Sequence, residues 1–207
     1  MPDETTTAVE LEDQEPIEAS EPVGLDPEAQ ERRSAALAQL RKFGDPVLRS
    51  PASPVSDFDQ MLAGEVERMV AIMRDGIGVG LAATQLGRLR RVLVFQAGAD
   101  APATAMVNPE VEWSSDELVM AEEGCLSIPG VIVDVERPLH VRVRASDAAG
   151  AAFLVEASGL EARVIQHEID HLDGVLILDR TTREQRKQAM RALREASAGT
   201  PPLGVGA

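Results

Sequence analysis

The chain has 207 residues, of which 44% are hydrophobic and 2% aromatic, and its formal net charge is −15. This length suits one ordinary domain with an appendage, and the hydrophobic share is sufficient for a core. So few aromatic side chains argue against a surface that stacks bases, and the negative charge argues against a broad phosphate-binding surface.

The beginning of the chain is strongly acidic. Residues 1–31 contain eleven carboxylates and neither lysine nor arginine. Low hydrophobicity with one sign of charge predicts disorder, and the lack of a basic start and an apolar run excludes a secretory signal. We therefore expect a disordered, solubilising leader over residues 1–33, although helix-forming sequence already starts near Asp26–Pro27.

The rest of the chain predicts helices and closely spaced strands. Helices are expected over residues 27–42, 56–75, 159–172 and 181–197. Strands are expected over residues 91–96, 105–113, 131–137, 141–146, 152–157 and 174–178. Because strands joined by short turns pair antiparallel, the pattern indicates an α+β fold.

Two features of the sequence limit where the protein works. No apolar run approaches the ~20 residues that cross a bilayer, so we expect no membrane partner. The single cysteine, Cys125, cannot form an internal disulfide, which fits a reducing compartment such as the cytoplasm.

The clearest chemical signal is the pair His167 and His171. Four residues make about one helical turn, so both imidazoles point off one face and can bind one ion. Glu168 stands beside them, where it can accept a proton from a water molecule that the ion activates. A chance pairing on a solvated helix is the alternative, but the chain has only three histidines.

A catalytic metal site needs a third protein ligand. One class of metalloproteases has the pattern HExxHxxGxxH, in which the last histidine is the third ligand. Gly174 matches the glycine of this pattern, but Ile177 occupies the position of the last histidine, which disfavours this class. Glu184 and Glu195 lie in a basic terminal helix and fit a surface better. His140 stands alone in strand-like sequence and is interpreted as a structural or surface residue.

Cys125 remains as a candidate ligand. Acidic neighbours raise the pKa of a free thiol, which makes Cys125 a poor nucleophile, whereas a divalent metal holds a thiolate. Taken alone, Cys125 is equally well explained as a small buried hydrophobic residue.

Three separated strings resemble the motifs of the peptide deformylase family. Gly78–Gln85 resembles GxGLAAxQ, Glu123–Ser127 matches EGCLS, and Gln166–His171 matches QHExDH. The resemblance covers roughly residues 35–182 and predicts a catalytic domain over residues 34–182, a basic helix over 183–197 and a flexible tail over 198–207. It implies antiparallel sheets wrapped around the central HExxH helix.

The resemblance also implies an activity and a cofactor. It identifies a hydrolase of protein biosynthesis that removes the formyl group from the N-terminal formyl-methionine of newly made polypeptides. The resemblance implies that Cys125, His167 and His171 bind one divalent ion. This ion is usually Fe(II) in the family, with Zn(II), Ni(II) or Co(II) as alternatives that these ligand types also accept.

Residue roles follow from the same resemblance. Glu168 transfers the proton, while the Gln85 side-chain amide and the Leu126 backbone N–H stabilise the oxyanion. Gly80 and Gly130 are expected to let the backbone of a peptide substrate approach the backbone of the protein. Gly80 is therefore grouped with the catalytic residues. The predicted apolar pocket for methionine consists of Val79, Ile128, Leu160 and Val164.

Four charged residues surround this predicted site. Arg137 resembles a family residue near the substrate, although a surface strand arginine is the alternative. The stem of Arg163 is expected to cover the pocket rim while its head stays in water. Glu123 and Asp170 are expected to accept hydrogen bonds from the metal-binding imidazoles, or else to form plain salt bridges.

The end of the chain is basic. Arg180, Arg183, Arg186, Lys187, Arg191 and Arg194 stand against Glu184 and Glu195, a net charge of +4. The resemblance suggests docking to ribosomal RNA; the alternatives are a solvated helix face or pairing with the acidic leader.

Two other functions fit parts of the pattern. A general metallopeptidase would take a third ligand other than Cys125. A non-catalytic protein that binds ribosomes or stores metal would have no use for the general base Glu168.

Overall fold

The computed structural model describes residues 24–98 and 101–198, so most of the predicted leader and the tail from residue 199 lie outside the described residues. Helix α1 (Pro27–Ala38) begins where Asp26 accepts a hydrogen bond from the Ala29 N–H through its side chain. The predicted leader boundary at residue 33 is therefore wrong, because it falls inside this helix. The helix also ends four residues before the predicted residue 42.

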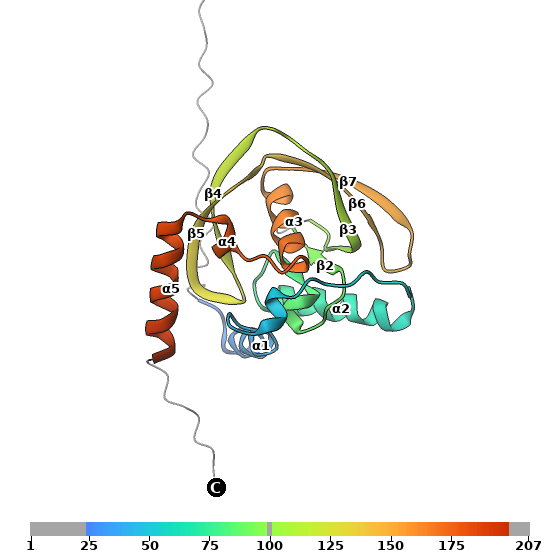
Figure 1. Cartoon of the computed structure of the whole chain (residues 1–207). Coiled ribbons are helices and arrows are strands. Elements are labelled where there is room, and N and C mark those ends of the chain that lie inside the picture. The colour runs from blue at the N-terminus through green and yellow to red at the C-terminus, as the bar shows by residue number, and fades with distance from the viewer. Residues whose placement is uncertain (1–23, 99–100, 199–207) are drawn as a thin grey trace, which may run out of the picture.

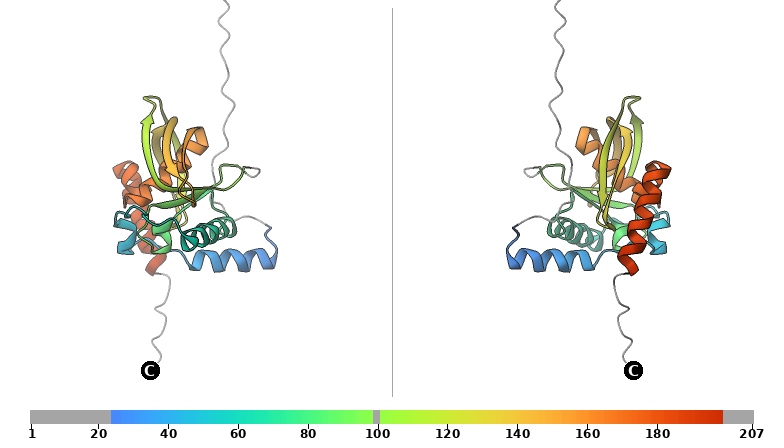
Figure 2. Two further views of the ribbon diagram at one scale, coloured as in Figure 1. Left: turned by 90° about the vertical axis from the view of Figure 1, so that its right-hand side faces the viewer. Right: turned by 90° about the vertical axis from the view of Figure 1, so that its left-hand side faces the viewer.

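Helix α2 follows after the short 3₁₀ helix η1 (Pro46–Arg49). It spans Gln60–Asp75, and the side chain of Asp59 accepts a hydrogen bond from the Leu62 N–H at its start. Its apolar side, expected from the spacing of three and four, buries Leu62, Met69 and Met73. Figure 2 shows α1 and α2 next to each other, below the sheets.

Five strands form one antiparallel sheet in the order β1-β2-β3-β6-β7. They are β1 (Gly80–Ala82), β2 (Val92–Phe95), β3 (Thr104–Ser114), β6 (His140–Ser146) and β7 (Ala152–Ser158). The 3₁₀ helix η2 (Ala83–Leu86) follows β1 directly. All four residues of β2 are buried, because α2 covers one face of the strand and α3 (Gly159–Leu172) the other.

The remaining two strands form a separate antiparallel hairpin. It consists of β4 (Leu118–Cys125) and β5 (Ile128–Pro138). Strand β4 is absent from the sequence prediction, because its residues show no alternation of buried and exposed positions: half are exposed and only Glu123 is buried. Figure 1 shows α3 in the middle of the fold, with the β4–β5 hairpin on one side and β3, β6 and β7 on the other.

The segment after α3 corrects one prediction. Residues 174–178 are not a strand; instead the short helix α4 (Ile177–Arg180) forms there. Its start is fixed because the Asp179 carboxylate accepts a hydrogen bond from the Leu176 N–H at 2.9 Å. Helix α5 (Arg183–Ala198) then packs on the outside of β5, where Ala189, Met190 and Leu193 contact the apolar residues of the hairpin.

Within the described ranges, none of the helices has the length and apolar character that crossing a membrane would require.

Candidate metal centre

Two imidazoles of α3 stand one turn apart on the side that faces the hairpin. The ring centroids of His167 and His171 lie 5.0 Å apart. The Thr84 hydroxyl donates to the His171 carbonyl at 3.1 Å, which ties this turn of the helix to η2. The spacing of four residues therefore has the structural consequence that the sequence predicts.

Cys125 is the last residue of β4, and the fold brings its sulfur to these imidazoles. Its Sγ lies 3.2 Å from His171 Nε2, and the candidate ligand atoms of Cys125, His167 and His171 all lie within 4.8 Å of one another. A tetrahedral ion with typical bond lengths separates a sulfur and a nitrogen ligand by about 3.5 Å. The three residues fit a single divalent ion.

The charges of these groups also suit a metal. Burial alone would raise the pKa of the Cys125 thiol, but the two imidazoles lower it well below its ordinary value. Burial alone would lower the pKa of His167, but hydrogen bonds with Cys125 and Glu123 raise it well above its ordinary value. A thiolate beside two imidazoles is a ligand set that several divalent ions accept.

Glu168 occupies the position expected of a general base. Its side chain is buried, and among the described residues its Oε2 atom has no hydrogen-bond partner. Burial raises the pKa of this carboxyl group. A buried carboxylate oxygen without a partner is uncommon, and it marks a site where a ligand or water is to be received.

Gly80 makes room for this carboxylate. A Cβ atom built on Gly80 would lie 2.3 Å from Glu168 Oε1, closer than atoms can approach. Any other residue at position 80 would therefore displace the carboxylate or the strand β1. This contact, rather than backbone freedom, explains why a glycine suits the position.

Gln85 reaches the metal centre from η2. Its Oε1 accepts a hydrogen bond from the Ala82 N–H at 2.9 Å, which orients the amide. Its Nε2 then donates to Ser127 Oγ at 3.2 Å and lies 3.7 Å from Cys125 Sγ. An N–H donor is thus held beside the candidate ligands, next to the turn that contains Leu126.

Glu123 fixes the ring of His167. Its Oε2 accepts a hydrogen bond from His167 Nδ1 at 2.9 Å, which leaves Nε2 for an ion. Burial alone would raise the pKa of Glu123, but hydrogen bonds from Arg137 and His167 lower it well below its ordinary value. The carboxyl group therefore stays ionised, and the proton stays on Nδ1.

Arg137 joins Glu123 to Asp170. It donates to both carboxylate oxygens of Glu123, at 2.6 and 2.9 Å, and to Asp170 Oδ2 at 2.9 Å. Arg180 donates to the same Asp170 carboxylate. Asp170 therefore forms salt bridges, one of the two roles expected for it, and Glu123 takes both expected roles.

The structure excludes the surface alternative for Arg137 and corrects the expectation for Arg163. Arg137 is 4% exposed and Arg163 is 7% exposed. Arg137 is not a surface strand residue, and the head of Arg163 does not stay in water, because each guanidinium group finds carboxylate partners inside the protein.

The four predicted apolar pocket residues divide into two pairs. Ile128 and Val164 are buried, whereas Val79 is 44% exposed and Leu160 is 42% exposed. Gly130 has a left-handed φ of +73°, and a Cβ built there would meet nothing within 4 Å. Two of the four side chains are therefore closed to solvent, and the other two are partly open to it.

The other ligand candidates lie elsewhere. In the part of the chain that the structure describes, the group of side chains able to hold an ion contains neither His140 nor the two glutamates of α5. His140 is exposed at the start of β6, and its backbone N–H donates to Ser115.

Sequence reasoning missed three residues near the centre. Ser127 accepts the Gln85 hydrogen bond, Arg180 holds Asp170, and Lys42 Nζ donates to the Leu126 carbonyl at 3.1 Å. Ser127 lies within the EGCLS string and was open to prediction as a partner. Lys42 and Leu126 are 84 residues apart in sequence. Arg180 lies only 10 residues after Asp170, but it reaches the carboxylate from the next helix, so neither contact is indicated by a periodic pattern within one element.

Comparisons with known proteins show which family this chain resembles. Residues 37–187 match the family model described as polypeptide deformylase. The peptide deformylase of Acidothermus cellulolyticus is 45% identical over 161 residues, which are 78% of this chain and 88% of the relative. That of Thermotoga maritima is 45% identical over 150 residues, which are 72% of this chain and 90% of the relative.

A solved structure gives the same result. The peptide deformylase of Synechococcus elongatus in complex with actinonin superimposes with a TM-score of 0.70 at 42% sequence identity. The match covers 74% of this chain and 84% of that structure.

Proposed function

The chain belongs to the polypeptide deformylase family, and on that premise we propose how its own residues carry out the reaction. It is a metal-dependent hydrolase that removes the formyl group from the N-terminal formyl-methionine of newly made polypeptides. The observation that carries the residue assignment is the convergence of Cys125, His167 and His171 on one point.

These three side chains would hold the metal ion. When bound, a divalent ion supplies a Lewis acid and lowers the pKa of a coordinated water molecule. The ion we propose for the cell is Fe(II), because it is the usual ion of the family that the three motifs resemble. Zn(II), Ni(II) and Co(II) suit the same thiolate and imidazole ligands.

Glu168 is the proposed general base. Its unpartnered Oε2 is available to accept the proton of the attacking water and to deliver it to the leaving amine. The Gln85 amide and the Leu126 N–H are the proposed donors to the oxyanion, each contributing about 3 kcal/mol to transition-state stabilisation. The position of Gln85 Nε2, 3.7 Å from Cys125 Sγ, supports its assignment.

Substrate binding uses the residues around the centre. We assign the buried Ile128 and Val164 to the end of the methionine pocket and the half-exposed Val79 and Leu160 to its mouth. Gly80 and Gly130 would let the substrate backbone approach. The aliphatic lining suits the thioether of methionine.

The Glu168→Gln variant tests the assignment of the base. Glutamine keeps the shape of the side chain but cannot accept the proton. We expect kcat for formyl-Met-peptide to fall by roughly 10²–10⁴-fold. Metal content, measured by elemental analysis of anaerobically purified protein, should stay at the wild-type level. A rate of formate release near that of the wild type would refute the assignment.

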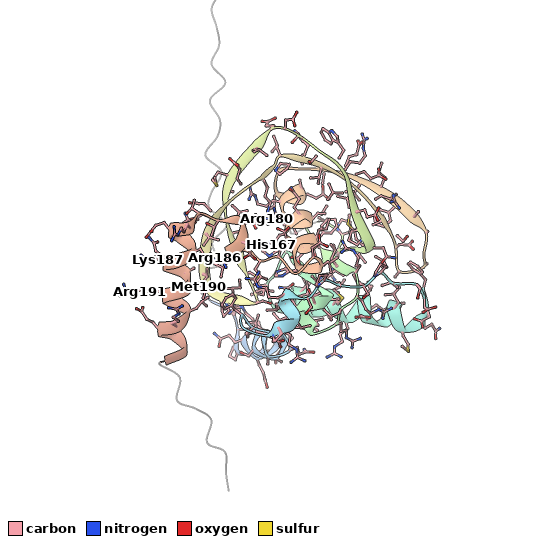
Figure 3. The ribbon with its side chains drawn as sticks, viewed as in Figure 1. His167, Arg180, Arg186, Lys187, Met190 and Arg191 are labelled. Atoms are coloured by element: carbon pink, nitrogen blue, oxygen red, sulfur yellow. The ribbon has the colours of Figure 1, made fainter. Side chains whose placement is uncertain are left out.

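We also propose where the enzyme works. A nascent formylated chain is its substrate, so the cytoplasm is the expected compartment, and the lone thiol of Cys125 agrees with reducing conditions. Helix α5 is the proposed docking element for the ribosome. Figure 3 shows Arg186, Lys187 and Arg191 on this helix at the outer flank of the molecule, where they are accessible to an RNA surface.

A further inference from the structure

Arg163 is a buried arginine on the metal-binding helix. Its Nη1 donates to Glu123 Oε1 at 2.7 Å and to the Val135 carbonyl at 2.8 Å. Its Nη2 donates to the Val119 carbonyl at 2.6 Å. Removing a guanidinium group from water is unfavourable unless hydrogen-bond acceptors inside the protein replace the lost water, and Arg163 has three such acceptors.

All three acceptors belong to the β4–β5 hairpin. Val119 and Glu123 lie on β4, and Val135 lies on β5. Among the described residues, this hairpin pairs with no strand of the larger sheet. Because a two-stranded hairpin is marginally stable by itself, its position depends on what holds it against its neighbours. Cys125, at the end of β4, takes its position from the hairpin.

Three successive turns of α3 contact the same hairpin. Arg163, His167 and His171 are spaced by four residues and so share one side of the helix. His167 contacts Glu123 at 2.9 Å and His171 contacts Cys125 at 3.2 Å. Of these three side chains, Arg163 is the one that is not a proposed ligand.

We propose that Arg163 is a positioning residue of the metal centre: it fastens the β4–β5 hairpin to α3 and thereby sets where Cys125 meets the two imidazoles. This inference rests on the proposed ligand set. Arg163 donates hydrogen bonds to both strands of the hairpin, because the several N–H groups of its planar guanidinium group point toward acceptors in three directions. Arg137 still binds Glu123 when Arg163 is lost, but the carbonyls of Val119 and Val135 then lose the hydrogen bonds from the guanidinium group of Arg163.

The Arg163→Met variant tests the proposal, because methionine keeps an unbranched stem without the donors. Affinity for Co(II) is measured by competition with a chelator, and the thiolate-to-cobalt absorption band reports whether Cys125 binds the ion. We expect 10–100-fold weaker binding, as for other residues that orient metal ligands, and a weaker band. The matched control is Arg142→Met on β6, whose arginine pairs with Glu156 at the surface, and we expect wild-type values.

A second variant separates positioning from general stability. Arg163→Lys keeps the charge, but its single ammonium group cannot satisfy three acceptors in different directions, so it too should bind Co(II) more weakly. If Arg163→Met does not fold, the cobalt affinity of Arg163→Lys tests the positioning role instead. Urea unfolding of the metal-free proteins measures stability independently.

Two results overturn the inference, and they are distinguishable. If the Arg163 variants lose stability but keep wild-type cobalt affinity and absorption, Arg163 is merely structural, and the ligand set stands. If the wild-type protein itself shows no thiolate-to-cobalt band, the proposed ligand set fails first, and the role of Arg163 falls with it.

Discussion

Single atoms decide the geometry around Glu168. The carboxylate lies against Gly80, where an added Cβ would come within 2.3 Å of Oε1. Glu168 is buried in α3, so it cannot withdraw into solvent. The space between the carboxylate of the proposed base and strand β1 is therefore too small to hold even one added methyl group.

The Gly80→Ala variant should lose activity for this reason. The methyl group must displace the carboxylate, and a misplacement of about 1 Å in an active site can lower the rate by ~10²-fold. Steady-state kinetics with formyl-Met-peptide measures the effect. Gly64→Ala is the matched control, because a Cβ on this exposed glycine of α2 would meet nothing within 4 Å. The control should keep full activity and gain about 0.5–1 kcal/mol in unfolding free energy; equal activity in both variants would contradict the prediction.

The sequence predicts the centre where chemistry and spacing are local. His167, Glu168 and His171 occupy one helical turn, so their arrangement follows from the helix alone. Cys125 needed the family resemblance, because its approach to His171 depends on the placement of a hairpin 46 residues away in sequence. The prediction that the head of Arg163 stays in water was wrong, because its burial depends on an ion pair with Glu123, a residue 40 positions away in sequence.

The same distinction applies to the elements. Helix α3 has the bounds that the sequence predicts, residues 159–172, because apolar and polar residues alternate at helical period and Ser158 and Gly174 flank it. Strands β3, β6 and β7 agree within one residue at each end. Strand β4 was missed, since its residues are held by pairing with β5 and not by a buried face of their own.

Helix α2 offers a test at the scale of an element. The Asp59 side chain accepts the Leu62 N–H at 2.9 Å and so satisfies a donor that the helix leaves unpaired. Asp59→Ala should lower the free energy of unfolding by about 1 kcal/mol, measured with urea. The rate of formate release should not change, because the Asp59 side chain caps the start of α2 and its hydrogen-bond partner, Leu62, is not a residue of the metal centre.

A neighbouring aspartate provides the control. Asp57 is exposed, lies before the helix and accepts a hydrogen bond from the adjacent Ser56 hydroxyl. Its replacement by alanine removes the same charge without removing a helix cap, so stability should change by no more than about 0.5 kcal/mol. Equal losses in the two variants would show that charge, rather than capping, stabilises this region.

At the scale of the whole molecule, the metal centre lies where independently built parts meet. The hairpin provides Cys125, α3 provides the imidazoles, and β1 with η2 provides Gly80 and Gln85. Three apolar clusters support these parts, one around α3, one around α2 and one between β5 and α5, and β1 contributes Ala82 to the first and Leu81 to the second. The positions of the metal-binding side chains therefore depend on how these clusters are held together. The contacts of Arg163 act on this arrangement, because they join α3 to the β4–β5 hairpin.

Charge is distributed over the molecule in opposite blocks. Eight carboxylates lie within residues 1–23, outside the described residues, and the basic residues gather on α5. Two cations of this region are already paired, Arg186 with Asp179 and Arg191 with Glu195. Arg183, Lys187 and Arg194 have no ion pair within residues 24–98 and 101–198 and are exposed, so they are the cations best able to contact phosphate.

Docking through α5 therefore predicts a particular salt dependence. Replacing Arg183, Lys187 and Arg194 together by glutamine should weaken binding to ribosomes and reduce the slope of log affinity against log salt by roughly one per lost phosphate contact. Sedimentation with ribosomes at several salt concentrations measures both quantities. The matched control replaces three exposed arginines of other elements, Arg68, Arg142 and Arg144, and should keep the wild-type slope. An unchanged slope in the α5 variant would refute docking through this helix. Deletion of residues 1–23 tests the role of the leader: tighter ribosome binding after the deletion would mean that the leader competes with the ribosome for α5.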